Sequence, residues 1–388
     1  MEKLKNIPSL RFPEFEGEWE NTKLGNVAKF SKGKGISKSE ISENGINECI
    51  RYGELYTRYG EVINDVYSKT NFNIDLSVVS EANDVIIPAS GETQIDIATA
   101  SCVLKSGVIL GGDLNIIKTN KNGVFLSYYL NNKRKLDIAN LAQGISVVHL
   151  YSSQLALLNL NFPSLPEQTK IASFLTAVDD KLTALKQKKA LLEQYKKGVM
   201  QKIFSQLLRF KDDNGNEYPD WEEKKLGDCL DYIQPTKYLV SSTEYDNSYS
   251  TPVLTAGKTF ILGYTNETNG IFENNLPVII FDDFTTATQF VDFPFKAKSS
   301  AMKILIAKEG INIKFIYEAM QVMNYEVGGH ERHWISKFAP LDISVPNHGE
   351  QTKIGNFLSA IDDKINHCQA QIEKTEFWKK GLLQQMFC

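Results

Sequence analysis

Two segments of the chain repeat one another, and this repeat constrains the fold more than any other feature. Residues 163–205 and 346–388 are identical at 18 of 43 positions, without a gap, at a constant offset of 183. Both copies contain Glu-Gln-Thr-Lys-Ile near the start and Asp-Asp-Lys further on. A fainter repeat opens each half, because Leu-Arg-Phe, Trp and Lys-Leu-Gly of residues 10–25 recur in residues 208–227. The chain is therefore a tandem of two halves, each with a variable region before its repeated segment.

We expect the repeated segments to be long helices. Their apolar residues alternate at steps of three and four, the period of a coiled-coil seam, although Lys196 and Lys379 interrupt the pattern. At ~1.5 Å per residue, a helix of about 38 residues is on the order of 55 Å long. We expect an antiparallel helix pair; the alternative is that each helix lies on its neighbouring domain. The expected interface residues are Leu175, Val178, Leu182, Leu185, Leu192 and Val199, with Leu358, Ile361, Ile365, Ile372 and Leu382 opposite.

The variable regions are expected to be mixed α+β domains. Short apolar runs at 84–88, 114–117 and 277–281 suit buried strands, and residues 125–130 and 313–320 suit single helices. The predicted fold class is α+β, with two globular domains separated by two long antiparallel coiled-coil helices and an internal pseudo-twofold repeat. The predicted boundaries are 1–160 and 207–344 for the domains, and 161–206 and 345–388 for the helices.

Composition excludes several classes of protein. The sequence has no apolar run near the ~18 residues that span a bilayer, and its first residues lack the apolar stretch of a signal peptide. The five cysteines are scattered and never spaced Cys-x-x-Cys, which argues against a disulfide framework or a zinc ribbon. We therefore expect a protein of the reducing cytoplasm.

No segment carries a recognisable active site. Gly257-Lys258-Thr259 matches the end of a P-loop, but Pro252 stands where that loop needs its first glycine. A metal bound by His330 and His333 would need further ligands, so we interpret residues 328–334 as a recognition loop or a solvated turn. We expect no catalytic residue, no metal and no cofactor.

The repeated Asp-Asp pairs are the remaining candidates for a metal site. Asp179 and Asp180 recur as Asp362 and Asp363 within the helical repeat. Duplicated carboxylates could bind a metal. We favour a role in helix solubility or contact with a basic partner.

The whole arrangement resembles the specificity subunit of type I restriction-modification enzymes. The motif Glu-Gln-x-x-Ile-x-x-x-Leu-x-x-x-Asp stands at 167–179 and again at 350–362, and Trp-x-x-x-Lys-Leu-Gly stands at 19–25. The second copy departs in carrying His348-Gly349 where the first has Leu-Pro. The resemblance covers the entire chain.

The resemblance implies a non-catalytic DNA-recognition subunit. Each variable region would be a target-recognition domain that reads one half of a bipartite double-stranded DNA site. The helices would space the two domains and dock two methylation subunits, through which restriction subunits join. The methyltransferase and ATP-dependent nuclease activities would belong to those partners. The alternative is a coiled-coil adaptor with two ligand-binding domains and no DNA role.

Candidate DNA contacts are chosen by residue type and by a loop-like context. Lysine and arginine suit phosphates or guanine edges, and glutamine can pair with adenine. The same residue types also occur on solvated surfaces. In the first domain the candidates are Lys32, Lys34, Arg51, Tyr52, Arg58, Tyr59, Ser90, Gln143, Ser146 and His149. In the second they are Thr255, Lys258, Thr285, Thr286, Gln289, Lys298, Arg332, His333 and Lys337.

The charge balance limits how the chain can bind DNA by itself. The chain has 43 basic and 47 acidic side chains, a net charge of −4. Neither variable region is basic enough to bind DNA strongly through counterion release. We therefore expect weak, salt-sensitive DNA binding by the isolated chain, and tight binding once partners enclose the duplex.

Overall fold

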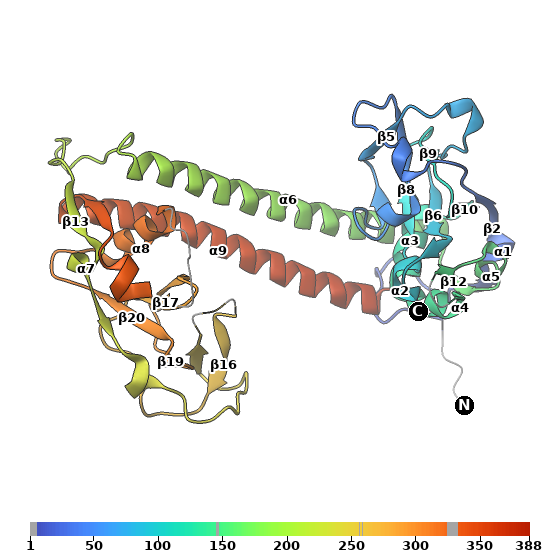
Figure 1. Cartoon of the computed structure of the whole chain (residues 1–388). Coiled ribbons are helices and arrows are strands. Elements are labelled where there is room, and N and C mark those ends of the chain that lie inside the picture. The colour runs from blue at the N-terminus through green and yellow to red at the C-terminus, as the bar shows by residue number, and fades with distance from the viewer. Residues whose placement is uncertain (1–5, 145–146, 256, 258, 324–332) are drawn as a thin grey trace. The chain divides into compact units, whose positions relative to one another are not determined.

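The computed structural model describes residues 6–144, 147–255, 257, 259–323 and 333–388. The chain forms two compact units, residues 1–186 with 370–388 (unit 1) and residues 187–369 (unit 2). Each unit contains one α+β domain and a part of each of the two long helices (Figure 1). This architecture confirms the predicted fold class.

The domain of unit 1 is built on a five-stranded sheet of order β2-β10-β6-β8-β4. The central strand β6 is buried along its length, as its continuous apolar run predicts, and pairs antiparallel with β10 and β8. A smaller sheet has the order β5-β3-β9, and β1 pairs with β12 and β7 with β11. The strands are β1 Glu20–Lys23, β2 Ala28–Lys32, β3 Asn47–Ile50, β4 Val62–Ile63, β5 Ser68–Thr70, β6 Asp84–Pro88, β7 Ser90–Gly91, β8 Ser101–Val103, β9 Ile109–Leu110, β10 Leu114–Thr119, β11 Val148–His149 and β12 Asn159–Phe162.

Short helices connect these strands. The helix α3 begins after Asn122, whose side chain accepts a hydrogen bond from the Phe125 amide and so caps the first turn. It covers β6 and β8, as expected for the helix predicted at 125–130. The helices of this domain are α1 Leu24–Val27, α2 Gln94–Ile97, α3 Gly123–Asn132, α4 Lys135–Leu141 and α5 Ser152–Leu155, with 3₁₀ turns η1 Lys38–Glu40, η2 Tyr52–Glu54 and η3 Ile74–Leu76.

The domain of unit 2 repeats this plan with a four-stranded sheet of order β14-β20-β17-β18. A second sheet has the order β16-β15-β19, and β13 pairs with β21. The helix α8 is capped by Asn312 as α3 is capped by Asn122. The elements are β13 Glu222–Lys225, α7 Leu226–Cys229, β14 Leu230–Ile233, η4 Pro235–Tyr238, β15 Thr251–Leu254, β16 Ile261–Thr265, β17 Val278–Asp282, β18 Thr288–Val291, β19 Lys296–Ala297, β20 Met302–Ala307, α8 Ile313–Val322, the π-helical turn η5 Trp334–Phe338 and β21 Asp342–Val345.

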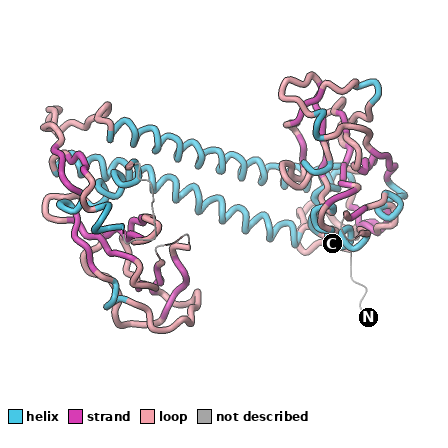
Figure 2. Tube along the Cα trace, viewed as in Figure 1, coloured by secondary structure: helices cyan, strands magenta, loops and turns pink. Residues whose placement is uncertain are grey.

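The two repeated segments form the long helices, cyan in Figure 2: α6 (Leu165–Phe204, 40 residues) and α9 (His348–Gln385, 38 residues). In unit 1 the first half of α6 lies beside the end of α9, where Lys379 Nζ is 2.6 Å from Asp179 Oδ1. In unit 2 the second half of α6 lies beside the start of α9. The helices are therefore antiparallel within each unit, as predicted.

The expected interface residues differ in burial along the helices. Leu175, Val178 and Leu382 belong to the core of unit 1, and Leu358 and Ile361 to the core of unit 2. The buried members are Leu175, Val178, Leu182, Leu358, Ile361, Ile372 and Leu382. The half-buried members are Leu185, Leu192, Val199 and Ile365.

An aromatic cluster joins each domain to the helices at repeat-equivalent positions. In unit 1 the ring of Phe125 contacts Trp19 and Phe387, with centroids 5.7 and 5.5 Å apart. In unit 2 Phe315 contacts Trp221 and Phe204 at 5.7 and 5.6 Å. The end of each long helix is thus part of the core of its unit.

Candidate functional site

A buried glutamate at the start of each long helix holds the opening segment of its half. In unit 1 the Arg11 guanidinium donates two hydrogen bonds of 2.8 Å to the carboxylate of Glu167, which is 1% exposed. Trp19 Nε1 donates a third, at 3.3 Å. Hydrogen bonding to Glu167 raises the pKa of Arg11 above its ordinary value. We call this contact set the clasp; a paired and fully hydrogen-bonded carboxylate can be buried at low cost.

Unit 2 contains the same clasp. Arg209 donates two hydrogen bonds of 2.8 Å to Glu350, and Trp221 Nε1 donates a third at 3.1 Å. Glu350 is fully buried. The repeated arginine, tryptophan and glutamate of the two halves therefore act together in each unit.

The glutamine after each clasp glutamate ties the helix to its domain. Gln168 Oε1 accepts a hydrogen bond from the backbone amide of Asn122 at 3.0 Å, and Gln168 Nε2 donates to the Pro163 carbonyl. Gln351 makes the same two contacts in unit 2, with Asn312 and Pro346. The Glu-Gln motif thus orients each domain on its own helix.

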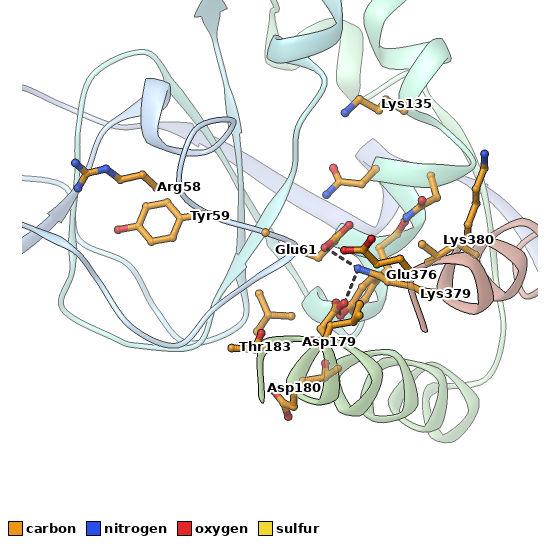
Figure 3. A pocket seen from close by; sticks show the side chains of 18 of the residues that line it. Arg58, Tyr59, Glu61, Lys135, Asp179, Asp180, Thr183, Glu376, Lys379 and Lys380 are labelled. Atoms are coloured by element: carbon orange, nitrogen blue, oxygen red, sulfur yellow. Dashed lines mark hydrogen bonds and ion pairs between the residues drawn. The ribbon is translucent and has the colours of Figure 1, made fainter. Parts of the chain in front are cut away.

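The first aspartate of the Asp-Asp repeat binds a lysine of the opposite helix. In unit 1 Asp179 pairs with Lys379 (Figure 3). Asp179 also accepts a 2.5 Å hydrogen bond from the Tyr128 hydroxyl. Lys379 also lies 3.7 Å from Glu61. Burial, and next the Asp179 charge, raise the pKa of Tyr128. These groups line a cleft of about 1090 Å³ with Arg58, Lys135 and Lys380 on its walls.

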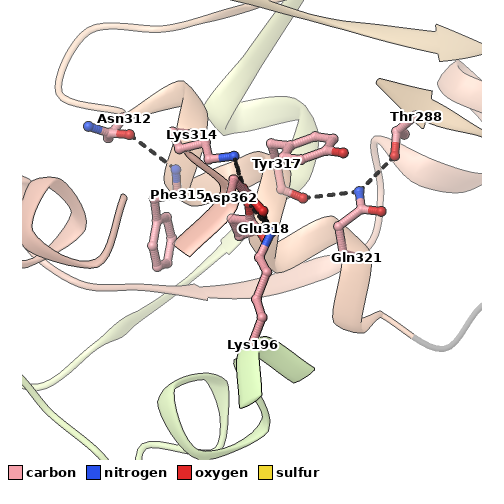
Figure 4. Close-up of polar contacts among 9 residues, drawn as sticks. All are labelled: Lys196, Thr288, Asn312, Lys314, Phe315, Tyr317, Glu318, Gln321 and Asp362. Carbon is pink, nitrogen blue, oxygen red and sulfur yellow. Dashed lines mark hydrogen bonds and ion pairs between the residues drawn. The ribbon is translucent and has the colours of Figure 1, made fainter. Parts of the chain in front are cut away.

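Unit 2 has a denser cluster at the equivalent place, shown in Figure 4. Lys196 lies 2.7 Å from Asp362 and 2.9 Å from Glu318, and Lys314 lies 2.8 and 2.7 Å from the same two carboxylates. Burial alone would raise the pKa of Asp362, but hydrogen bonds from Lys196 and Lys314 hold it below its ordinary value. The predicted basic partner of the repeated aspartates is therefore within the chain, and it is the lysine that interrupts each seam.

The predicted DNA contacts of unit 1 fall mostly on neighbouring segments. Arg51 and Tyr52 lie at η2, which packs against β7. The strand β7 pairs with β11, so Ser90 lies opposite His149, which bridges to Gln143. Ser90 is buried, whereas Gln143 and His149 are exposed. Ser146 lies outside the described residues.

The other four candidates of unit 1 flank this surface. The backbone amide of Lys34 donates a hydrogen bond to the Leu110 carbonyl. The next amide, that of Gly111, donates to the carbonyl of Ile50, the residue directly before Arg51. Lys32, at the end of β2, is exposed, as is Arg58. The ring of Tyr59 stacks on that of Tyr67, with centroids 5.3 Å apart.

In unit 2 the turn between β17 and β18 carries Thr285 and Thr286. Asp282 Oδ1 accepts hydrogen bonds from the amides of Phe284 and Thr285, which shapes the turn. Beneath it, Asp283 accepts from the Trp334 amide at 3.0 Å and lies 3.4 Å from the buried Lys303. This buried ion pair supports the turn.

The remaining candidates of unit 2 are dispersed. Gln289 lies on β18 and is half-buried. Thr255 follows β15 beside Lys298, which donates its amide to Leu254. Lys337 is exposed on η5, whereas His333 is fully buried and cannot present its side chain at the surface. Lys258 and Arg332 lie outside the described residues.

Several exposed side chains beside these candidates were not predicted. Tyr67 is 62% exposed and Phe284 43% exposed. Lys38 and Lys69 line a cleft with Arg51. The fourth tyrosine of residues 52–67 was a signal for Tyr67, but nothing in the sequence places Lys38 and Lys69 beside Arg51.

Two further classes of site are missing from the part of the chain that the structure describes. Its helices include none long and apolar enough to cross a membrane. Its histidine, cysteine, aspartate and glutamate side chains form no group of three or more that could hold a metal ion.

The comparisons with known proteins agree on one family. The chain is 46% identical over 155 residues to the specificity subunit of the type I restriction enzymes EcoR124I and EcoR124II of Escherichia coli, a match over 38% of each chain. It is 26% identical over 255 residues to the MjaVIII specificity subunit of Methanocaldococcus jannaschii, over 63% of this chain and 56% of that relative. The chain thus matches less than two thirds of the length of either relative.

The fold has a solved counterpart. The S subunit of a type I restriction-modification system from M. genitalium superposes with a TM-score of 0.73 at 17% identity, over 98% of this chain and 99% of that one. A family model described as the type I restriction modification DNA specificity domain matches residues 16–194 and 218–375. Since these segments cover most of both halves, the chain belongs to the type I restriction modification DNA specificity family.

Proposed function

We propose that this chain is the DNA-recognition subunit of a type I restriction-modification complex, with each domain reading one half of a bipartite double-stranded target. The observation that carries the proposal is the contrast within the repeat. The clasp is the same in both units, whereas the segments that carry the candidate contacts differ, with η2, β7 and β11 in unit 1 and the β17–β18 turn in unit 2. A common frame with two different surfaces suits recognition of two different half-sites.

The long helices space the two domains and dock two methylation subunits. Tyr195 on α6 and Trp378 on α9 are repeat-equivalent and 53% and 45% exposed. Leu191 and Phe377 are exposed beside them, at 64% and 81%. Exposed aromatic side chains are typical anchors of protein interfaces, and a duplicated surface suits two copies of one partner.

Catalysis belongs to the partners in this proposal. The methylation subunits transfer the methyl group to adenine, and restriction subunits, which join through them, supply the ATP-dependent nuclease. The chain itself contributes the sequence preference and the distance between the half-sites.

The test of recognition is methylome sequencing of a host that expresses this chain with its methylation subunits. The expected result is a bipartite adenine motif that is absent from a matched host without the chain. If no such motif appears, and the chain neither shifts DNA nor copurifies with methylation subunits, the adaptor function replaces this one.

The docking surface has its own test. Tyr195→Glu with Trp378→Glu should weaken association with the methylation subunits, measured by size-exclusion chromatography of the mixed proteins. Gln194→Glu is the matched control for the Tyr195→Glu substitution, because each adds one negative charge and Gln194 is exposed beside Tyr195. Association that survives the double substitution would place the docking surface elsewhere.

A further inference from the structure

A cleft in the domain of unit 1 gathers cations that have no acidic partner. It has a volume of about 840 Å³ and lies between η1, η2 and β5. Lys38, Arg51, Arg58 and Lys69 line it. No carboxylate of the described residues lies within ion-pair distance of these four, although other lysines of the same domain, such as Lys105, are paired.

The backbone of Arg51 is fixed by the side chain of a buried glutamate. Its backbone amide donates a 2.8 Å hydrogen bond to Glu54 Oε2, and the other oxygen of Glu54 accepts from the Ser68 hydroxyl. Glu54 is 4% exposed, so this support is inside the domain. Arg51 Nε is buried and has no hydrogen-bond partner among the described residues. The rest of the Arg51 side chain is half-buried at the wall of the cleft, so its terminal nitrogens are the part that a ligand in the cleft can meet.

The rest of the lining suits a nucleic acid more than a free anion. Tyr56 and the exposed Tyr67 provide aromatic faces. Glu43 and Glu92 add exposed carboxylates that can accept hydrogen bonds from a cytosine amino group. The turn η2 packs against β7, and β7 pairs with β11, so the segments that carry Arg51 and His149 belong to the same part of the domain.

We propose that this cleft binds target DNA, with Arg51 reading a guanine edge and Lys38, Arg58 and Lys69 contacting phosphates. The inference rests on the proposed function and adds a division of roles. An arginine guanidinium can present two donors side by side to guanine O6 and N7. Exposed lysines on flexible stems suit phosphates, which carry no sequence information.

The experiment uses the chain assembled with its methylation subunits and duplexes that carry its methylated motif. Each base pair of the motif is substituted in turn, and binding is measured at several salt concentrations. Arg51→Ala should reduce discrimination at one G·C pair in one half of the motif by on the order of 10- to 100-fold. Preferences in the other half should not change, which makes that half an internal control.

Lys69→Gln should behave differently. It should leave every base preference intact, weaken binding to all duplexes equally, and reduce the slope of log affinity against log salt by about one. Lys105→Gln is the matched control, because this lysine of the same domain already pairs with Glu48 at 3.0 Å. It should change neither the preferences nor the slope.

A conservative variant separates reading from folding. Arg51→Lys keeps the charge but removes the forked donor, so it should lose the preference at the same base pair while retaining most of the affinity. If folded Arg51→Ala and Arg51→Lys variants keep every preference, the role of Arg51 is wrong; if Lys69→Gln also keeps the wild-type slope, the cleft does not contact DNA. A wild-type complex without any base preference would instead refute the proposed function.

Discussion

The two units have the same contacts at the start of the long helix but different contacts where the domain meets the helix pair further along. The clasp is the same in both, with arginine–glutamate distances of 2.8 Å in each unit. At the cluster around the repeated aspartate, unit 1 places Tyr128 where unit 2 places Glu318. Only the lysine–aspartate pair between the two helices is common to both clusters.

This difference separates the contacts that define the frame from those that adapt to each domain. Glu318 adds a negative charge, and Lys314 from the same turn of α8 compensates it. In unit 1 a neutral hydroxyl fills the place, and Lys379 is the one lysine of the described residues that forms an ion pair with Asp179. A domain can therefore change its side of the cluster as long as the interhelical pair is kept.

Breaking the clasp should reduce the free energy of unfolding more than any other change, and by the same amount in the two units. Arg11→Ala and Arg209→Ala each leave a carboxylate that is at most 1% exposed without its cation. Removing one partner of such a pair should cost roughly 3–5 kcal/mol of unfolding free energy. Urea unfolding measures the loss, and hydrogen exchange at the start of α6 or α9 locates it. Unequal losses would show that the two clasps stabilise their units differently despite having the same geometry.

Removing the interhelical lysine should destabilise the protein more in unit 2 than in unit 1. Lys196→Met leaves the fully buried Glu318 with Lys314 as its one remaining lysine partner among the described residues. One Glu318 oxygen already lacks a hydrogen-bond partner within that part of the chain. Lys379→Met affects Asp179 and Glu61, whose side chains are 30% and 19% exposed and can be hydrated. We expect a loss of about 2–3 kcal/mol for Lys196→Met and about 1 kcal/mol for Lys379→Met, measured by urea unfolding. The reverse order would contradict the contrast drawn between the clusters.

The pH dependence of stability should differ in direction between the clusters. Burial opposes the charge on Asp362, but hydrogen bonds from Lys196 and Lys314 prevail and its pKa is lowered. Its stabilisation is therefore complete above the unfolded pKa, near 4, and is lost as pH falls through the folded pKa. Asp362→Asn should flatten the acid arm of the stability profile.

Tyr128 should act on the alkaline arm. Burial, and next Asp179, raise its pKa, so the folded protein keeps a proton that the unfolded chain releases near pH 10. The stabilisation is complete below that pH and is lost as pH rises. Tyr128→Phe should flatten the alkaline arm. Thermal unfolding from about pH 3 to pH 11 tests both variants, and an unchanged slope in either would remove that group from its cluster.

Much of this frame could be predicted because its signals are periodic or local. The seam spacing predicts α6 and α9, and the buried run at 84–88 predicts β6. The role of Glu167 was missed, since Arg11 and Trp19 lie about 150 residues away along the chain. The joint recurrence of all three residue types was nevertheless a usable signal.

The proposed recognition surface was less predictable because it depends on loops brought together by the sheets. Arg51, Gln143 and His149 were chosen by residue type, and β7 with β11 brings their segments together. The burial of His333 could not be inferred, because its backbone amide pairs with Asp283, fifty residues earlier. Alternation and composition do not report such long-range pairings.

The smallest effect should come from an ion pair that joins the same two helices in solvent. Lys186 Nζ lies 2.7 Å from Glu376 Oε1, a distance like that between Lys196 and Asp362, but its two side chains are 58% and 48% exposed. A double-mutant cycle of Lys186→Ala and Glu376→Ala should give a coupling of at most about 0.5 kcal/mol, since water and salt screen an exposed pair. The same cycle for Lys196 and Asp362 should give a clearly larger value. Equal coupling energies would mean that the short distance determines how strongly each lysine joins the helices. Burial by the domain and the carboxylate of Glu318 would then contribute nothing to the difference.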